Sequence, residues 1–245
     1  MSTHPDEASS PAHGSGRSDL MLLGILSVLA GLVDVIGFLR LGHVFTAHIT
    51  GNLVVMADEI ANGGPPHVAQ VLSIPVFVIA VVIAYVLVIQ TRTTRGRIPL
   101  LVGQAVLLIL VVYFAVRAND VGTPTPPQQI LAAMLAVAAM AFQNAFIRVS
   151  LQESATTSVM TGNVTSSVLA LLALLGRGPW PHDEAVAKLR RTVPLVIGFF
   201  VGCTLGAAAA THLGPWAWTL PALLSLAVIP VGVRLPLPLT PQLGR

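Results

Sequence analysis

The sequence has few charged residues and almost no cysteine. Asp, Glu, Lys and Arg make up only 9% of its 245 residues, whereas soluble domains carry about 25%. So few charges cannot cover a globule in water, which excludes an ordinary soluble enzyme. The single cysteine, Cys203, cannot form an internal disulfide, so no disulfide framework is expected.

Common catalytic and nucleotide-binding signatures are also missing. The chain contains no G-x-S-x-G, H-E-x-x-H or G-x-x-x-x-G-K-[ST] motif, so it lacks the usual patterns of serine hydrolases, zinc proteases and ATPases. Its basic residues are scattered rather than clustered with aromatic residues, which argues against nucleic acid as a partner. We therefore expect no enzyme activity, no cofactor and no metal site.

Most of the remaining residues are apolar. They make up 54% of the chain, and the mean hydropathy is +0.82. A helix that spans a bilayer needs about 20 mostly apolar residues. The stretches of that kind are Leu20–Leu39, Val71–Gln90, Ile98–Val116, Ile130–Ile147, Thr192–Thr211 and Trp216–Val233. The sequence thus predicts an all-α polytopic protein whose solvent is the lipid bilayer.

Two shorter segments, His48–Ala61 and Thr156–Leu175, each contain Thr-Gly-Asn followed by an aliphatic run, and we name them the TGN segments. If both enter the membrane and return, 11 of the 13 basic residues share the side of the two termini, and only Arg40 and Arg117 lie opposite. With eight full spans, 8 of the basic residues lie on the side of the two termini and 5 lie on the opposite side. Because Lys and Arg favour cytoplasmic loops, we expect six spans plus two broken or re-entrant segments, with both termini cytosolic. Seven or eight full spans are the alternative, since the second segment is long enough to cross.

The TGN segments belong to an internal repeat. Thr46–Asn52 (TAHITGN) recurs 111 residues later as Thr157–Asn163 (TSVMTGN), with four of seven positions identical. With three spans in each half, the second copy would be inverted, as in many secondary transporters; a duplication kept only for packing is the alternative. The predicted divisions are a disordered cytosolic tail (1–19), a first membrane repeat (20–117), a linker (118–129), a second membrane repeat (130–234) and a cytosolic tail (235–245).

The motifs around these segments point to a family. The stretch GLVDVIGFLRLGHVFTAHITGNLVV, residues 31–55, resembles the YoaK-like family of bacterial inner-membrane proteins through Gly31–Asp34, the turn Gly42–Phe45 and Thr50–Asn52. In the second half, Phe142–Asn144, Thr157 and Thr161–Asn163 fit the same pattern. The resemblance covers residues 20–235 and implies a multi-pass protein of the bacterial cytoplasmic (inner) membrane. The family carries no established substrate or reaction.

Asp34 is the first candidate for a functional residue. A carboxylate inside a spanning helix costs about 2.5–3.5 kcal/mol on insertion scales, so such residues are functional candidates by default. Gly24, Ser27 and Gly31 share its helix face, and small residues there let another helix approach. Asp34 should therefore face protein or a cavity. A structural acid paired with Thr, Asn or Arg is the alternative.

The TGN segments supply hydroxyl and amide groups. We expect Gly51 and Gly162 to permit non-helical backbone at a break, and Asn52 and Asn163 to satisfy the backbone groups freed there; a helix-packing motif is the alternative. His48 is a candidate proton carrier, because histidine is the side chain that changes charge near neutral pH. The other half has Val159 in its place, which favours a satisfied or interface-exposed histidine. The candidate pathway residues are Asp34, Thr46, His48, Thr50, Gly51, Asn52, Gln143, Asn144, Thr157, Thr161, Gly162 and Asn163.

Two further patterns concern packing. Gly198, Gly202 and Gly206 form G-x-x-x-G-x-x-x-G, a close-packing face within the chain or in a homo-oligomer. Trp180, Trp216 and Trp218 are predicted interfacial anchors.

Together these features favour a permease or transporter of a small solute or ion, with its site between the two repeats. A non-transporting scaffold or partner subunit that assembles through the glycine face is the alternative.

Overall fold

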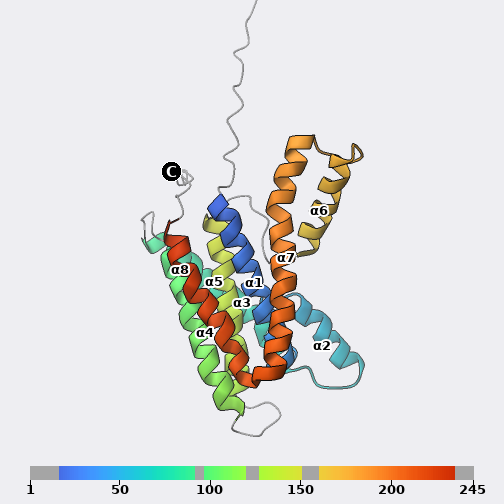
Figure 1. Ribbon diagram of the computed structural model, residues 1–245. Coiled ribbons are helices and arrows are strands. Elements are labelled where there is room, and N and C mark those ends of the chain that lie inside the picture. Colours follow the sequence, from blue (N-terminus) through green and yellow to red (C-terminus); the bar gives the residue numbers. More distant parts are fainter. Residues whose placement is uncertain (1–16, 92–96, 120–126, 151–159, 235–245) are drawn as a thin grey trace, which may run out of the picture.

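The computed structural model describes residues 17–91, 97–119, 127–150 and 160–234, and all regular structure in these ranges is helical. The elements, shown in Figure 1, are α1 (Arg17–Arg40), α2 (Gly51–Ala61), α3 (Val68–Thr91), α4 (Ile98–Asn119), α5 (Pro127–Ser150), α6 (Met160–Leu174), α7 (His182–Leu213), the 3-10 helix η1 (Gly214–Trp218) and α8 (Thr219–Arg234).

The long helices are apolar enough to cross a membrane. In the described ranges, five helical segments meet the requirements of length and composition: Asp19–Arg40, Val68–Gln90, Ile98–Ala118, Pro127–Ser150 and the 53-residue segment His182–Arg234. The last of these reverses direction at η1, so that α7 and α8 run antiparallel (Figure 1). The prediction of an all-α membrane protein is therefore confirmed. The TGN segments contain the short helices, α2 with 11 residues and α6 with 15.

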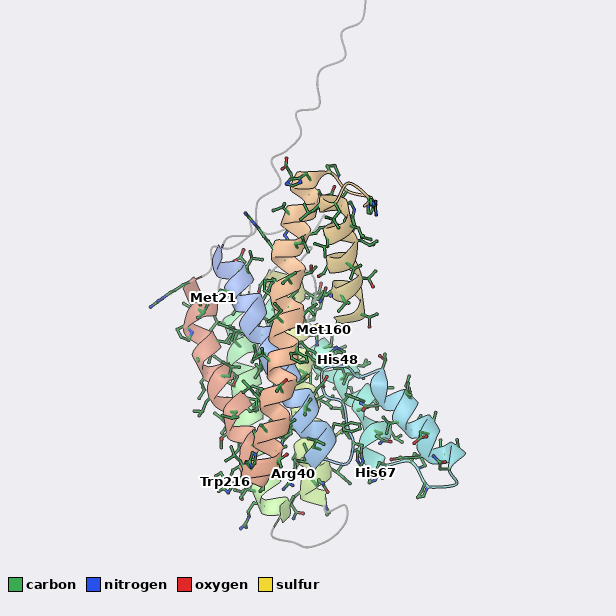
Figure 2. The ribbon with its side chains drawn as sticks, turned by 45° about the vertical axis from the view of Figure 1, so that its right-hand side comes forward. Met21, Arg40, His48, His67, Met160 and Trp216 are labelled. Carbon is green, nitrogen blue, oxygen red and sulfur yellow. The ribbon has the colours of Figure 1, made fainter. Side chains whose placement is uncertain are left out.

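The bundle has two distinct ends. α1 begins and α8 ends at the same end (Figure 1). Along α1, Met21 lies near this end and Arg40 near the opposite one, beside Trp216 (Figure 2). Arg97, which precedes α4, is buried: burial lowers the pKa of its guanidinium, and the Asp19 carboxylate raises it. This electrostatic interaction joins the start of α4 to the start of α1.

The backbones of α1 and α7 approach each other closely, because both helices have glycines where they meet. A Cβ built on Gly198 would lie 2.7 Å from the carbonyl oxygen of Gly24, and one on Gly202 or Gly31 would overlap the facing backbone. The Ser27 hydroxyl donates to the Leu195 carbonyl over 2.5 Å. The predicted close-packing faces of both helices are thus confirmed. Of the two arrangements that the sequence allowed, within the chain or in a homo-oligomer, the structure shows packing within the chain.

Burial follows the pattern of a membrane protein. The apolar windows of α1 and α5 are 67% buried, whereas that of α3 is 17% buried and presents its aliphatic side chains outward. Trp216 is 57% exposed, but Trp218 is fully buried. The anchor prediction is wrong for Trp218 because η1 turns its ring inward toward Gly37 of α1. Trp180 is partly buried against the contact between α6 and α7, with the Lys188 Nζ 4.3 Å from its ring centroid.

Candidate functional site

The loop between α1 and α2, residues 41–50, returns along α1. Gly42 has φ 78° and His43 has φ 57°, a left-handed conformation that is uncommon for a residue with a side chain. The His43 ring packs on Phe38 with the ring centroids 5.0 Å apart. This reversal directs the following residues back toward the middle of α1, where Asp34 lies.

Asp34 holds this loop in place. It is 2% exposed, and its Oδ1 accepts hydrogen bonds from the Thr46 and Ala47 backbone N–H groups over 2.7 and 2.6 Å and from the Thr46 hydroxyl over 3.1 Å. Its Oδ2 lies 2.5 Å from the His48 Nδ1. Three consecutive loop residues therefore converge on one carboxylate. The partners are a Thr and a His together with backbone groups.

His48 lies between this carboxylate and α7. Its side chain is 26% exposed, and its ring meets the Phe199 ring edge-on at 4.9 Å. The Nε2 atom is buried and has no hydrogen-bond partner among the residues that the structure describes. The Nδ1 of the imidazole is thus bonded to Asp34, while its Nε2 makes no hydrogen bond within the described ranges.

Asn52 closes the loop from the other side. Its Oδ1 accepts from the Phe45 N–H over 2.7 Å, and its Nδ2 donates to the Phe45 carbonyl over 2.8 Å and to the Ser73 Oγ over 2.9 Å. The prediction that Asn52 satisfies freed backbone groups is confirmed. The expectation for Gly51 is wrong: it is the first residue of α2 and has no left-handed φ. A Cβ there would lie 2.8 Å from the Phe45 ring, so a larger residue would force that ring to shift.

The second TGN segment differs from the first. α6 begins at Met160 and is helical through Gly162, so the backbone does not break at this glycine. Thr161 is exposed, and Asn163 is buried. Thr157 and the other residues of 151–159 lie outside the described ranges. The Ser167 and Thr192 hydroxyls, 2.7 Å apart, join α6 to α7.

The two short helices start at the same height of the bundle. In both views the N-terminal ends of α2 and α6 lie at the height of the middle of α7, and the helices run from there toward opposite ends (Figures 1 and 2). Figure 2 shows Met160, at the start of α6, directly above His48. Asp34 thus bonds to Thr46 and His48, and Asn52 bonds to Phe45 of the same loop. We call these two neighbouring hydrogen-bonded groups the cluster; the exposed Thr50 lies between them in the sequence.

Gln143 and Asn144 make other contacts. The Gln143 Nε2 donates to the Leu26 carbonyl over 3.0 Å, and its Oε1 accepts from the Gln104 Nε2 over 2.8 Å, so these bonds join α5 to α1 and α4. Asn144 donates to the Met140 carbonyl in its own helix. The Gln143 bonds therefore brace the core of the bundle, whereas the Asn144 bond stays within α5.

Sequence reasoning missed three members of the cluster: Phe45, Ser73 and Phe199. Ser73 carried a signal, because it is a hydroxyl near the start of a long aliphatic run, and its Oγ also donates to the Gln70 carbonyl over 2.6 Å. The two aromatic residues carried none, since phenylalanine is expected anywhere in a membrane helix or loop.

Two other features lie apart from this cluster. A groove of about 530 Å³ between α4 and α8 is lined mainly by apolar side chains, with Tyr113, Arg117 and Trp216 among them. At the far end of α2, Glu59 accepts hydrogen bonds from the His67 N–H and the Gln70 Nε2. In the part of the chain that the structure describes, no three His, Cys, Asp or Glu residues are grouped so that they could hold a metal ion.

Comparisons with known proteins agree with the resemblance noted in the sequence. Residues 22–231 match the family model described as "Protein of unknown function (DUF1275)". The chain is 31% identical over 146 residues to the UPF0700 transmembrane protein YoaK of Bacillus subtilis (strain 168), an alignment that covers 59% of this chain and 64% of that relative. No solved structure matches the chain.

Proposed function

The chain belongs to the DUF1275 family of proteins of unknown function, and we propose that it is a permease for a small solute or ion. Its pathway lies between the two halves of the chain, at the N-terminal ends of α2 and α6. Its location is the bacterial cytoplasmic membrane.

The observation that carries the proposal is the pair of short helices. With 11 and 15 residues, α2 and α6 are about 17 and 23 Å long, less than the roughly 30 Å of a hydrocarbon core. Their N-terminal ends face each other at mid-height (Figure 2). Non-helical backbone such as the loop 41–50 is tolerated at membrane depth only where protein covers it or a water-filled cavity receives it. Half-helices that meet near the midplane are typical of transporter sites.

The order of the elements supports two inverted halves. The first half contains α1, the short α2, α3 and α4; the second contains α5, the short α6, α7 and α8. Each element of the second half runs opposite to its counterpart in the first (Figure 1). In the proposed topology the six long helices cross the membrane and both termini are cytosolic, since this arrangement puts most Lys and Arg on the cytoplasmic side.

The groups at the proposed site suit a small polar solute. Thr50 and Thr161 expose their side chains at the N-terminal ends of the two short helices, where the helix dipole places partial positive charge. In α2 the first N–H groups themselves donate to the carbonyls of His48, Ile49 and Thr50, so the exposed hydroxyls are the polar groups available there. The face on which a scaffold role was based, Gly198, Gly202 and Gly206, is buried against α1 of the same chain. That observation favours the permease over the scaffold.

A flux assay with site-directed blocking tests the proposal. Purified protein is placed in liposomes, and the liposome volume is followed after an osmotic step. Glycerol tests for passage of a neutral solute. Potassium chloride with valinomycin tests for passage of the anion, and potassium gluconate with a protonophore tests for passage of the cation. Thr50→Cys and Thr161→Cys, each in a Cys203→Ser background, are treated with a charged methanethiosulfonate reagent. The control is Leu171→Cys, on α6 but 54% exposed on its outer surface.

We expect at least one probe to cross faster than in protein-free liposomes, and the reagent to at least halve that flux at Thr50→Cys and Thr161→Cys but not at Leu171→Cys. The permease proposal fails if no probe crosses faster with protein than without it. The proposed location fails if labelling at all three positions has the same effect.

A further inference from the structure

The hydrogen bonds around Asp34 define its charge. Backbone N–H groups can only donate, so the Oδ1 that faces Thr46 and Ala47 acts as an acceptor. The Oδ2 lies 2.5 Å from the His48 Nδ1. The arrangement in which every donor meets an acceptor is an ionised carboxylate that receives the Nδ1–H of the imidazole.

In that tautomer the other ring nitrogen of His48 holds a lone pair. This Nε2 is buried and has no hydrogen-bond partner in the described ranges. Both carboxylate oxygens of Asp34 already accept hydrogen bonds, from Thr46, Ala47 and His48, and the Asn52 amide bonds to Phe45 and Ser73. The His48 Nε2 is therefore the basic atom of this cluster that has room for one more proton.

Binding a proton there changes the charge of the cluster from −1 to 0. A lone carboxylate buried at membrane depth is costly, whereas an imidazolium and carboxylate in contact form a neutral pair. We infer that the Asp34–His48 pair is the binding site for a proton that the protein couples to transport. The inference rests on the proposed permease and names its coupling ion.

Access to this proton site depends on movement. Although the His48 side chain is 26% exposed, its Nε2 is covered, and the Phe199 ring of α7 packs against the imidazole. The loop 41–50 or the Phe199 ring must shift before a proton reaches the nitrogen. Because covering Nε2 changes the groups that the bound proton meets, the covered and exposed states bind it with different affinities, so proton binding and the shift are thermodynamically linked.

Few other titratable groups face the pair. From α7, the Cys203 thiol lies within the electrostatic reach of Asp34. α2 and α3 contribute the neutral Asn52 and Ser73, and the nearby His43 of the same loop packs on Phe38. A pH response assigned to the pair must therefore persist in Cys203→Ser.

The first arm of the test reads protonation without any flux. Protein with ¹⁵N-labelled histidine in lipid nanodiscs is titrated between about pH 5 and pH 9, and the His48 signals are identified by their loss in His48→Asn. Asn is chosen because its amide can still donate to Asp34 but cannot titrate. We expect the His48 Nε2 to gain a proton as the pH falls, and Asp34→Asn to lower the midpoint by about one pH unit or more, because it removes the neighbouring charge. Asp58→Asn, an exposed carboxylate, is the matched control and should leave the midpoint unchanged.

The second arm measures flux of the probe that proves permeant, with and without a pH gradient. Wild type and Cys203→Ser should respond to the gradient at least fivefold, His48→Asn should lose the response, and the exposed His212→Gln should keep it. A His48 ring that keeps one protonation state over the whole range overturns the inference, as does a gradient response that survives in His48→Asn. Flux that ignores pH overturns the proton site while the permease stands; absence of all flux overturns both.

Discussion

The two TGN segments share a tripeptide but are held by different forces. The N-terminal end of α2 is fixed by polar bonds that run from the loop 41–50 to Asp34 of α1 and from Asn52 of α2 itself to Ser73 of α3. α6 instead lies along α7, on a small apolar cluster of Ala170, Ala173 and Ala185 with one bond between hydroxyls. Among the described elements, α6 packs on α7 alone. The motif thus marks where each short helix begins, while its surroundings decide how that helix is attached.

This difference predicts different sensitivities. Polar bonds to a buried carboxylate are lost together when the charge is removed, because several donors depend on one acceptor. An apolar contact loses stability in proportion to the area or volume removed. Substitutions at the N-terminal end of α2 should therefore lower the free energy of unfolding strongly, and substitutions in α6 should lower it only slightly.

The largest effect is expected for Asp34→Ala. It leaves two buried backbone N–H groups and a hydroxyl without their acceptor, so the free energy of unfolding should fall by about 3–5 kcal/mol. Tryptophan fluorescence during unfolding in detergent measures this, and hydrogen exchange should rise in α2 but not in α6. Asp58→Ala, at an exposed site on α2, is the control; equal losses in the two variants would refute the assignment.

A smaller loss is expected for Asn52→Ala. The substitution leaves the N–H and carbonyl of Phe45 without their partners and removes the bond to Ser73, which should cost about 2 kcal/mol. The same unfolding assay applies, with limited proteolysis in the loop as a local readout. Asn62→Ala at the exposed end of α2, where the amide bonds to Asp58, should cost about 0.5 kcal/mol or less. If Asn62→Ala proved the more damaging, the role given to Asn52 would be wrong.

The smallest effect is expected at α6. Ser167→Ala removes the hydroxyl contact with Thr192 and should cost about 1 kcal/mol, with faster hydrogen exchange in α6 and no change in α2. Thr165→Ala, whose hydroxyl bonds within α6 itself, is the matched control. Loss of protection in α2 as well would mean that the two short helices are coupled more tightly than their contacts suggest.

Composition and periodicity were sufficient for much of the fold. Apolar runs located the long helices, and the small residues Gly24, Ser27 and Gly31 marked the face that meets α7, because close backbone approach needs the same residue types wherever it occurs. The partner of that face could not be predicted, since sequence pattern does not encode which of several glycine-bearing helices lies opposite.

The site was predicted only where a residue's chemistry limits its environment. A carboxylate in an apolar helix must be satisfied, and an Asn at a helix start tends to bond to nearby backbone, so Asp34 and Asn52 could be identified. The bonds from Gln143 to α1 and α4 could not be predicted, because a buried amide suits a contact between helices as well as it suits a pathway. Phe199 could not have been found, since its role depends on a ring contact across 151 positions of sequence.

The glycine contact between α1 and α7 has a consequence for motion. With backbones touching, these helices have no side-chain layer across which to slide, so they form a common rigid axis that joins the first half of the chain to the second. Asp34 and Phe199 both belong to these two helices, so the distance between their backbones stays fixed, while the Phe199 ring can still turn. Opening of the site must therefore come from the segments attached to these two helices, above all from movement of the loop 41–50 between α1 and α2.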